Sequence, residues 1–457
     1  MSVLFIFRRD LRIMDNLALN EAIEYTQNNN LNMILAFTFT NEQIENNTYF
    51  SMNSYQFMID CLIELNKNVN NKLSFFEDKY FYEKLDNIKA ICFNKDYTPY
   101  AIKRDKEIDK YCNEKNIKLI TAEDYTLLPM DLIKTTENKP YMVFTPFYNK
   151  CLQNYKKIRP VHTRRLNKDT IINISKTTLD KYIKYDNVHL NVHGGRDHAL
   201  AKLRYIKKGV YDNYKTKRDI PSHPNSTTEL SAYLKFGCVS IRETCFLLKS
   251  LYGVRTDLIK QLFWKEFYAY ITYHNPRVLH GMINESNETF NEKYNDINWK
   301  TNDFHFDKWC RGETGFPLVD AGMRQMNKTG YMHNRLRMIT ASFLIKDLHI
   351  DWRKGEKYFA SKLVDYDPAS NNGGWQWVAG TGTDASPYFR IFNPWTQIER
   401  FDKECKYIKE WVDELKDVDI KVIKKWNKLY KEYPDIKYTA PIVDHDVVKK
   451  EAVHYYK

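Results

Sequence analysis

The first 125 residues alternate short apolar runs with amphipathic stretches, and this rhythm constrains the fold more than any other feature of the sequence. Apolar runs at residues 3–7, 33–39, 72–76, 90–93 and 118–121 are typical of strands, and the stretches 16–27, 54–69 and 103–115 have a helical pattern. Strands that alternate with helices form parallel, doubly wound sheets. No G-x-G-x-x-G follows any of these strands, so we expect no dinucleotide held by the usual phosphate loop.

Beyond this domain the pattern changes twice. From 126 to 190 the periodicity fades into a polar run, which indicates a long connection with short helical turns. From 191 to 457 the pattern is helical, with a capping box at Ser240 and Glu243 and a helix over 258–273 that is apolar on almost every side. We therefore predict an α/β N-terminal domain with a doubly wound parallel sheet (1–125), an interdomain linker (126–190) and an all-α domain (191–457).

The segment 364–394 has the composition of a binding site. It crowds Trp375 and Trp377 together with glycines at 373, 374, 380 and 382 and shows no clean helical or strand period. Its polar side chains could bind a ligand through charge and hydrogen bonds: Asp365, Asp367, Asn371 and Arg390. The alternative is a glycine-rich surface loop with buried tryptophans, but loops rarely carry so much aromatic surface without using it.

Composition narrows the class of partner. The 70 Lys and Arg exceed the 58 Asp and Glu, which gives a net charge of +12 and makes a polyanion plausible without singling out nucleic acid. Aromatic residues make up 15% of the chain, which suits either stacking on bases or binding a large planar cofactor. The eight cysteines include no C-x-x-C pair, so we expect free thiols in a reducing compartment and no metal site. The apolar start is too short for a signal peptide or a membrane span.

Three stretches together resemble the photolyase/cryptochrome family, closest to the class I photolyases of cyclobutane pyrimidine dimers. They are Phe7-Arg8-Arg9-Asp10-Leu11-Arg12, the run from Tyr331 to Phe343, and the segment 364–394. The resemblance covers nearly the whole chain and is loosest between about 126 and 190. It implies an intracellular, monomeric, metal-free enzyme that repairs UV-damaged DNA by passing an electron from excited, reduced, anionic FAD to a flipped-out pyrimidine dimer.

The resemblance also implies how FAD is held. Thr227 and Thr228 open a helix with hydroxyl groups, which suits a diphosphate, although an ordinary helix cap explains these residues nearly as well. In the family, residues at the following positions bind the phosphates of a folded FAD: Tyr214, Thr227, Thr228, Leu230 and Ser231. Arg337 would pair with Asp365 beside the flavin, Asp367 would lie in the same site, and the amide of Asn371 would contact flavin N5. Trp299, Trp352 and Trp375 match a chain of three tryptophans that carries electrons to the flavin, although each could be plain core.

For the substrate, the resemblance implies an aromatic clasp. Trp264 and Trp377 match the tryptophans that hold the extruded dimer, and Asn334 and Met338 would line its pocket. Lys265, Arg335 and Arg390 would hold the flanking phosphates. One position departs from the pattern, because Gln261 replaces the glutamate usual in these dimer photolyases. This glutamine also occurs in cryptochrome-like blue-light sensors and in (6-4) photoproduct photolyases, which therefore stay open as alternatives.

A second chromophore is less determined. The loop from Phe93 to Ala101 resembles the family loop over an antenna pocket, but Tyr100 and Ala101 replace the Asn-Glu pair typical of folate binders. A deazaflavin or a second flavin near Arg9 and Asp96 is favoured over folate, and an empty pocket remains an alternative.

Overall fold

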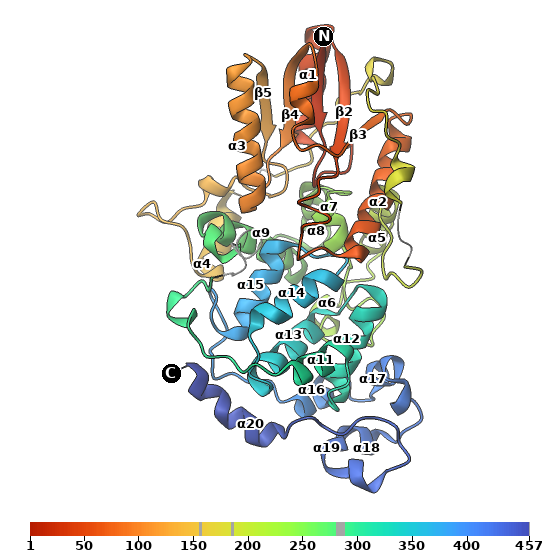
Figure 1. Ribbon diagram of the computed structural model, residues 1–457, viewed down its shortest axis with the longest axis vertical. Coiled ribbons are helices and arrows are strands. Elements are labelled where there is room, and N and C mark those ends of the chain that lie inside the picture. Colours follow the sequence, from red (N-terminus) through yellow and green to blue (C-terminus); the bar gives the residue numbers. More distant parts are fainter. Residues whose placement is uncertain (155–157, 184–186, 280–287, 457) are drawn as a thin grey trace.

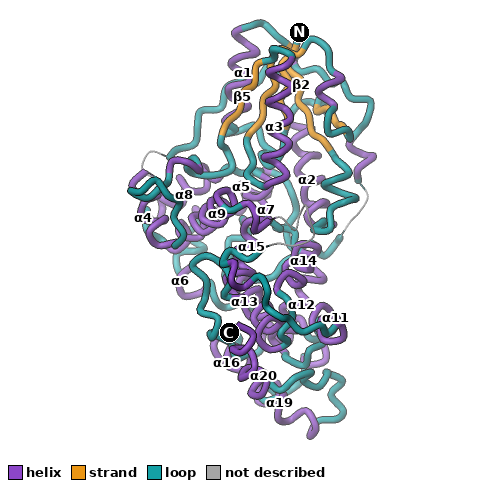
Figure 2. The backbone as a smooth tube through the Cα atoms, turned by 60° about the vertical axis from the view of Figure 1, so that its left-hand side comes forward, coloured by secondary structure: helices purple, strands orange, loops and turns teal. Residues whose placement is uncertain are grey.

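The computed structural model describes residues 1–154, 158–183, 187–279 and 288–456. All the strands gather at one end of the molecule, and helices make up most of the remainder (Figures 1 and 2). This arrangement confirms the predicted order of an α/β domain followed by a largely helical one.

The N-terminal domain is built on a five-stranded parallel sheet of order β3-β2-β1-β4-β5. Its strands are β1 (Ser2–Ile6), β2 (Asn32–Thr38), β3 (Leu73–Phe76), β4 (Ile88–Asn94) and β5 (Lys118–Ala122). Its helices are α1 (Leu17–Asn28), α2 (Met52–Asn68) and α3 (Pro99–Glu114). Helix α3 begins four residues before the predicted stretch, because Thr98 accepts a hydrogen bond from the Ala101 amide and Pro99 suits the first turn.

The predicted linker contains little regular structure. Its described part holds three short 3₁₀ turns and one α-helix, α4 (Phe144–Asn154). Helix α4 packs against the long buried helix α9 (Asp257–His274) of the helical domain. Part of the linker therefore belongs physically to the helical half.

The helical half forms two apolar cores. One is continuous with the N-terminal sheet and includes α9, and the other lies between the later helices. The remaining helices are α5 (Arg196–Lys207), α6 (Tyr214–Lys217), α7 (Ser231–Phe236), α8 (Ile241–Tyr252), α11 (Asp303–Arg311), α12 (Pro317–Thr329), α13 (Asn334–Ser342), α14 (Trp352–Lys362), α15 (Pro368–Ala379), α16 (Pro394–Phe401), α17 (Lys406–Trp411), α18 (Ile420–Lys424), α19 (Trp426–Leu429) and α20 (His445–Ala452). The predicted capping box at Ser240 and Glu243 is present, and Gly253 ends α8.

Two local features are not visible in the sequence pattern. Helix α13 ends as α-helix at Ser342 and continues as a π-helical turn over Phe343–Asp347. The segment 364–394, which lacks a visible period, contains α15. The Asp367 carboxylate accepts from the Ser370 amide at 2.9 Å, Pro368 fills the first turn, and Gly380 ends the helix at φ +81°.

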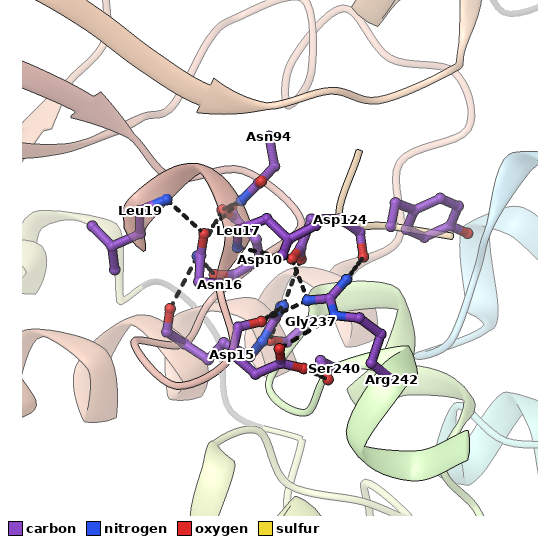
Figure 3. A network of polar contacts seen from close by, with 12 residues as sticks. Asp10, Asp15, Asn16, Leu17, Leu19, Asn94, Asp124, Gly237, Ser240 and Arg242 are labelled. Carbon is purple, nitrogen blue, oxygen red and sulfur yellow. Dashed lines mark hydrogen bonds and ion pairs between the residues drawn. The ribbon is translucent and has the colours of Figure 1, made fainter. Parts of the chain in front are cut away.

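Buried charges join the two halves (Figure 3). The Asp124 carboxylate accepts from Arg12 Nη2 at 2.5 Å and from Arg242 Nη2 at 2.6 Å, and Arg242 Nε donates to Asp15 at 3.2 Å. Burial alone would raise the pKa of Asp124, but Arg12 and Arg242 hold it below its ordinary value. Arg12 lies in the loop between β1 and α1, and Arg242 lies on α8. This network therefore fixes the sheet against the helical domain.

All eight cysteines are free and buried. Within the described ranges, no cluster of His, Cys, Asp and Glu side chains could hold a metal ion. No helix of the described residues is both long and apolar enough to cross a membrane.

Candidate functional site

A cavity of about 660 Å³ opens among α7, α9, α13 and α15 in the helical half. This volume is within the range of small-molecule and cofactor sites. Of the residues predicted from the sequence, the following line it: Tyr214, Thr227, Thr228, Leu230, Ser231, Gln261, Trp264, Lys265, Asn334, Arg335, Arg337, Met338, Asp365, Asp367, Asn371, Trp375 and Trp377. Residues predicted to hold a cofactor and residues predicted to hold a substrate therefore share one cavity.

Helix α15 forms part of the cavity wall, and at Gly374 this wall carries no side chain. A Cβ atom added to Gly374 would meet nothing within 4 Å, and Gly374 lines the cavity. Its neighbour Gly373 has the opposite role, because a Cβ there would come within 2.1 Å of the Tyr268 ring on α9. The two glycines thus let α15 pack closely on α9 and leave room for a flat group in the cavity.

An ion pair lies at the cavity wall. Arg337 Nη2 donates to both carboxylate oxygens of Asp365, at 2.9 and 3.1 Å, and Arg337 Nε donates to the Met332 carbonyl at 2.8 Å. The Asp365 side chain is buried, whereas Arg337 is half-buried. The Arg337 guanidinium is therefore fixed in orientation, and its positive charge can interact with the polar edge of a ring bound in the cavity.

The threonine side of the cavity carries hydroxyl groups. Thr227 Oγ1 and Tyr331 Oη lie 2.9 Å apart, and Ser231 is the first residue of α7. Leu230 precedes α7 and offers no side-chain cap, so the first turn keeps N–H groups that can bind an anion. The donors here match the chemistry of a diphosphate.

Asn371 is held from behind by the backbone of α14. Its Nδ2 donates to the Glu356 carbonyl at 3.1 Å, which uses one of its two amide protons. The amide is thereby oriented while its carbonyl oxygen and second proton stay available to a ring nitrogen.

The N-cap of α15 connects the cavity to the N-terminal domain. Arg9 Nη2 donates to Asp367, Tyr125 Oη donates to Asp367 at 2.7 Å, and Arg9 Nη1 donates to Asp96 at 3.3 Å. Burial would raise the pKa of Asp367, but Arg9 and Lys265 outweigh it and hold that pKa well below its ordinary value. The carboxylate therefore stays charged and ties the two domains together beside the cavity.

The three predicted relay tryptophans differ in burial. Trp375 and Trp352 are buried and Trp299 is half-buried. The Trp375 ring packs so closely on α14 that a Cβ at Gly355, three residues after Trp352, would come within 2.2 Å of it. Sequence reasoning missed Trp309, whose ring centroid lies 6.1 Å from that of Trp375. Its position in an ordinary amphipathic helix gave no signal.

Three residues were predicted to hold the phosphates that flank the dimer: Lys265 and Arg335 donate side-chain hydrogen bonds to protein groups, and Arg390 lies 5.7 Å from the Phe392 ring centroid. Lys265 Nζ donates to the Tyr125 carbonyl at 3.0 Å and lies 3.4 Å from the Tyr125 ring centroid, and burial lowers its pKa to about 8. Arg335 Nη2 donates to Asp219 at 2.7 Å. Arg390 lies outside the cavity, exposed in the loop after α15.

The pocket face of α13 presents Asn334 and Met338, one turn apart. Asn334 is exposed, and its Nδ2 lies 3.8 Å from Met338 Sδ. Gln261 is also exposed at the cavity, on α9. Tyr125, Lys235 and Tyr268 are among the further lining residues that the sequence pattern did not single out. Tyr125 lies in the loop after β5, Lys235 lies on α7, and Tyr268 lies on α9, whose pattern indicated only a buried helix.

Comparison with known proteins gives a consistent result. The family model for the FAD binding domain of DNA photolyase matches residues 258–457, and the model for DNA photolyase matches residues 3–165. The chain is 36% identical to a deoxyribodipyrimidine photo-lyase of Alkalihalophilus pseudofirmus and 35% identical to that of Escherichia coli, in each case over 99% of this chain and 97% of the relative.

Solved structures agree over the same length. The archaeal photolyase of Sulfolobus tokodaii, crystallised with two FAD molecules, aligns with a TM-score of 0.83 at 35% identity, over 100% of this chain and 99% of the other. A class III photolyase of Agrobacterium tumefaciens aligns with a TM-score of 0.87 at 30% identity, over 100% and 97% of the two chains.

Proposed function

Because this chain belongs to the DNA photolyase family, we propose that it is a deoxyribodipyrimidine photo-lyase, which uses light to split cyclobutane pyrimidine dimers in DNA. The observation that carries the proposal is the single cavity that unites donors for a flavin dinucleotide with aromatic side chains for extruded bases. Such a cavity can place the donor and the acceptor of an electron in contact.

FAD fits the residues present. The hydroxyls of Thr227, Thr228 and Ser231 would hold the phosphates, Arg337 and Asn371 would hold the polar edge of the flavin, and Gly374 leaves space for a flat ring. When bound in its reduced state, FAD supplies the light-driven electron that opens the dimer and returns afterwards. Trp375 would begin the path that restores reduced flavin. The protein's contribution is therefore position and electrostatics.

The dimer would enter beside Trp264, Trp377 and Met338. Flipping a base out of the duplex costs a few kcal/mol, less for damaged bases, and each stack on an aromatic ring returns ~1–3 kcal/mol. Gln261 and Asn334 would donate to the pyrimidine edges. Arg390 would bind a flanking phosphate, and the net charge of +12 would draw the chain to DNA.

A second chromophore belongs to the same proposal. Arg9 and Asp96 lie at the carboxyl end of the sheet, where open α/β sheets bind ligands. The S. tokodaii photolyase holds two FAD molecules, which favours a second flavin or a deazaflavin over folate here. Extraction of the chromophores from protein purified from its native cells would identify the second chromophore.

The function is tested with UV-irradiated oligothymidine and reduced protein. Dimers should disappear under blue light and persist in the dark. Equal loss in the dark, or no loss in either condition, would contradict the proposal. Protein stripped of flavin provides the control for direct photolysis.

A further inference from the structure

Resting on the proposed function, we infer that Phe144, in the segment between the two domains, is a positioning residue for substrate through Trp264. Phe144 is the first residue of α4, and its ring stacks on the Trp264 ring with centroids 3.7 Å apart and planes inclined by 4°. Phe144 is buried at 4% exposure, whereas Trp264 is half-buried and lines the cavity. One face of the indole is therefore covered, which leaves the other for an incoming base.

Other rings restrict Trp264 from the side. Phe267 meets its edge at 5.8 Å and 81°, and Tyr268 lies tilted at 5.6 Å. These contacts limit translation of the indole, but among the described residues the Phe144 ring alone lies parallel to it and so fixes its plane. Stacking on a base requires parallel rings, so the plane of Trp264 decides how well a base can stack.

The backbone around Phe144 is itself fixed on two sides. The Phe144 amide donates to Asp384 Oδ2 at 3.1 Å, and Thr383 Oγ1 donates to the Met142 carbonyl. On the other side, the Tyr141 amide donates to Tyr270 Oη on α9 at 3.1 Å.

These bonds connect the elements that carry the two clasping tryptophans. Trp264 and Tyr270 both lie on α9, while Thr383 and Asp384 follow α15, which carries Trp377. Residues 141–144 thus bridge α9 to the loop after α15. The bridge holds the plane of one tryptophan and the distance to the other.

The test compares Phe144→Leu with Phe147→Leu. Phe147 lies on the same helix, is buried to 3%, and contacts Phe267 and Tyr270 but makes no ring contact with Trp264 among the described residues. Both variants lose a buried aromatic ring, so both should lower the melting temperature. Phe144→Leu should also weaken binding to a duplex with one thymine dimer by about fivefold to tenfold, part of the value of one base stack. Binding to undamaged duplex should not change in either variant.

A double-mutant cycle separates positioning from general loosening. In a Trp264→Ala background, Phe144→Leu should cause no further loss of dimer affinity, because the ring that it orients is absent. Equal dimer affinity of the Phe144→Leu and Phe147→Leu variants, or a full additional loss in the Trp264→Ala background, would overturn the inference. A wild-type protein that binds dimer and undamaged duplex equally would overturn the proposed function as well.

Discussion

Replacing Trp377 by alanine tests the substrate pocket with little disturbance of the fold. Trp377 is half-buried and lines the cavity, and among the described residues no aromatic ring stacks on it. Removing the ring takes away one stacking surface, worth ~1–3 kcal/mol per base. At about 1.4 kcal/mol for each factor of ten, the affinity for dimer-containing duplex should fall roughly 5- to 150-fold.

The stability of this variant should change less than that of a variant truncated at a fully buried tryptophan. Truncating a fully buried tryptophan costs about 3–5 kcal/mol, and a half-buried ring should cost less. Trp395→Ala is the matched control, because Trp395 is also half-buried but lies outside the cavity, tilted against Phe316 at 5.1 Å. It should destabilise the protein without weakening dimer binding.

The assay is equilibrium binding to duplexes with and without a single thymine dimer, together with thermal unfolding of each variant. A Trp377→Ala protein that discriminates the dimer as well as the wild type would refute the assignment of the clasp. So would a Trp395→Ala protein with the same loss of dimer affinity.

Three further outcomes follow from the structure. Asp124→Asn should lower the free energy of unfolding by about 3 kcal/mol in a denaturant titration, because it leaves Arg12 and Arg242 without their shared negative charge. The control is Glu137→Gln in an exposed ion pair, which should change this free energy by less than about 1 kcal/mol. Equal effects of the two substitutions would contradict the role of Asp124. Burial lowers the pKa of His333 and of His349 to about 4, below an unfolded value near 6.5. The free energy of unfolding should therefore be highest above about pH 6.5 and should fall as the pH drops toward 4. His333→Gln should make the free energy of unfolding less dependent on pH over this range. Trp375→Phe should stop light-driven reduction of oxidised flavin, while the chemically reduced variant still splits dimers; unchanged photoreduction would remove Trp375 from the electron path.

The sequence predicts the sheet well and the details of the site less well. Alternating strands and helices indicate a parallel sheet because each helix serves as the crossover connection between parallel strands, and β1 to β5 fall where the apolar runs do. The segment around Trp375 hid a helix, because α15 packs on α9 on one side and faces a cavity on another, which removes the usual apolar stripe.

Contacts between distant segments could not be predicted. Nothing in the residues around Phe144 indicates that its ring meets Trp264, since 120 positions separate them and only the packing of α4 on α9 brings them together. The same holds for Lys265, whose charge predicts a phosphate contact but whose ammonium lies on the Tyr125 ring. Local patterns specify elements, whereas such pairs depend on the completed fold.

The central claim is that the cavity beside Trp264 and Trp377 is the site of FAD, and the flavin content of the purified protein tests it most directly. The wild type should release one FAD per chain on denaturation. Gly374→Leu should stay folded but lose most of that FAD, because its side chain would occupy the open space at α15. A wild-type protein unable to take up FAD, or a Gly374→Leu protein that retains it fully, would contradict the account.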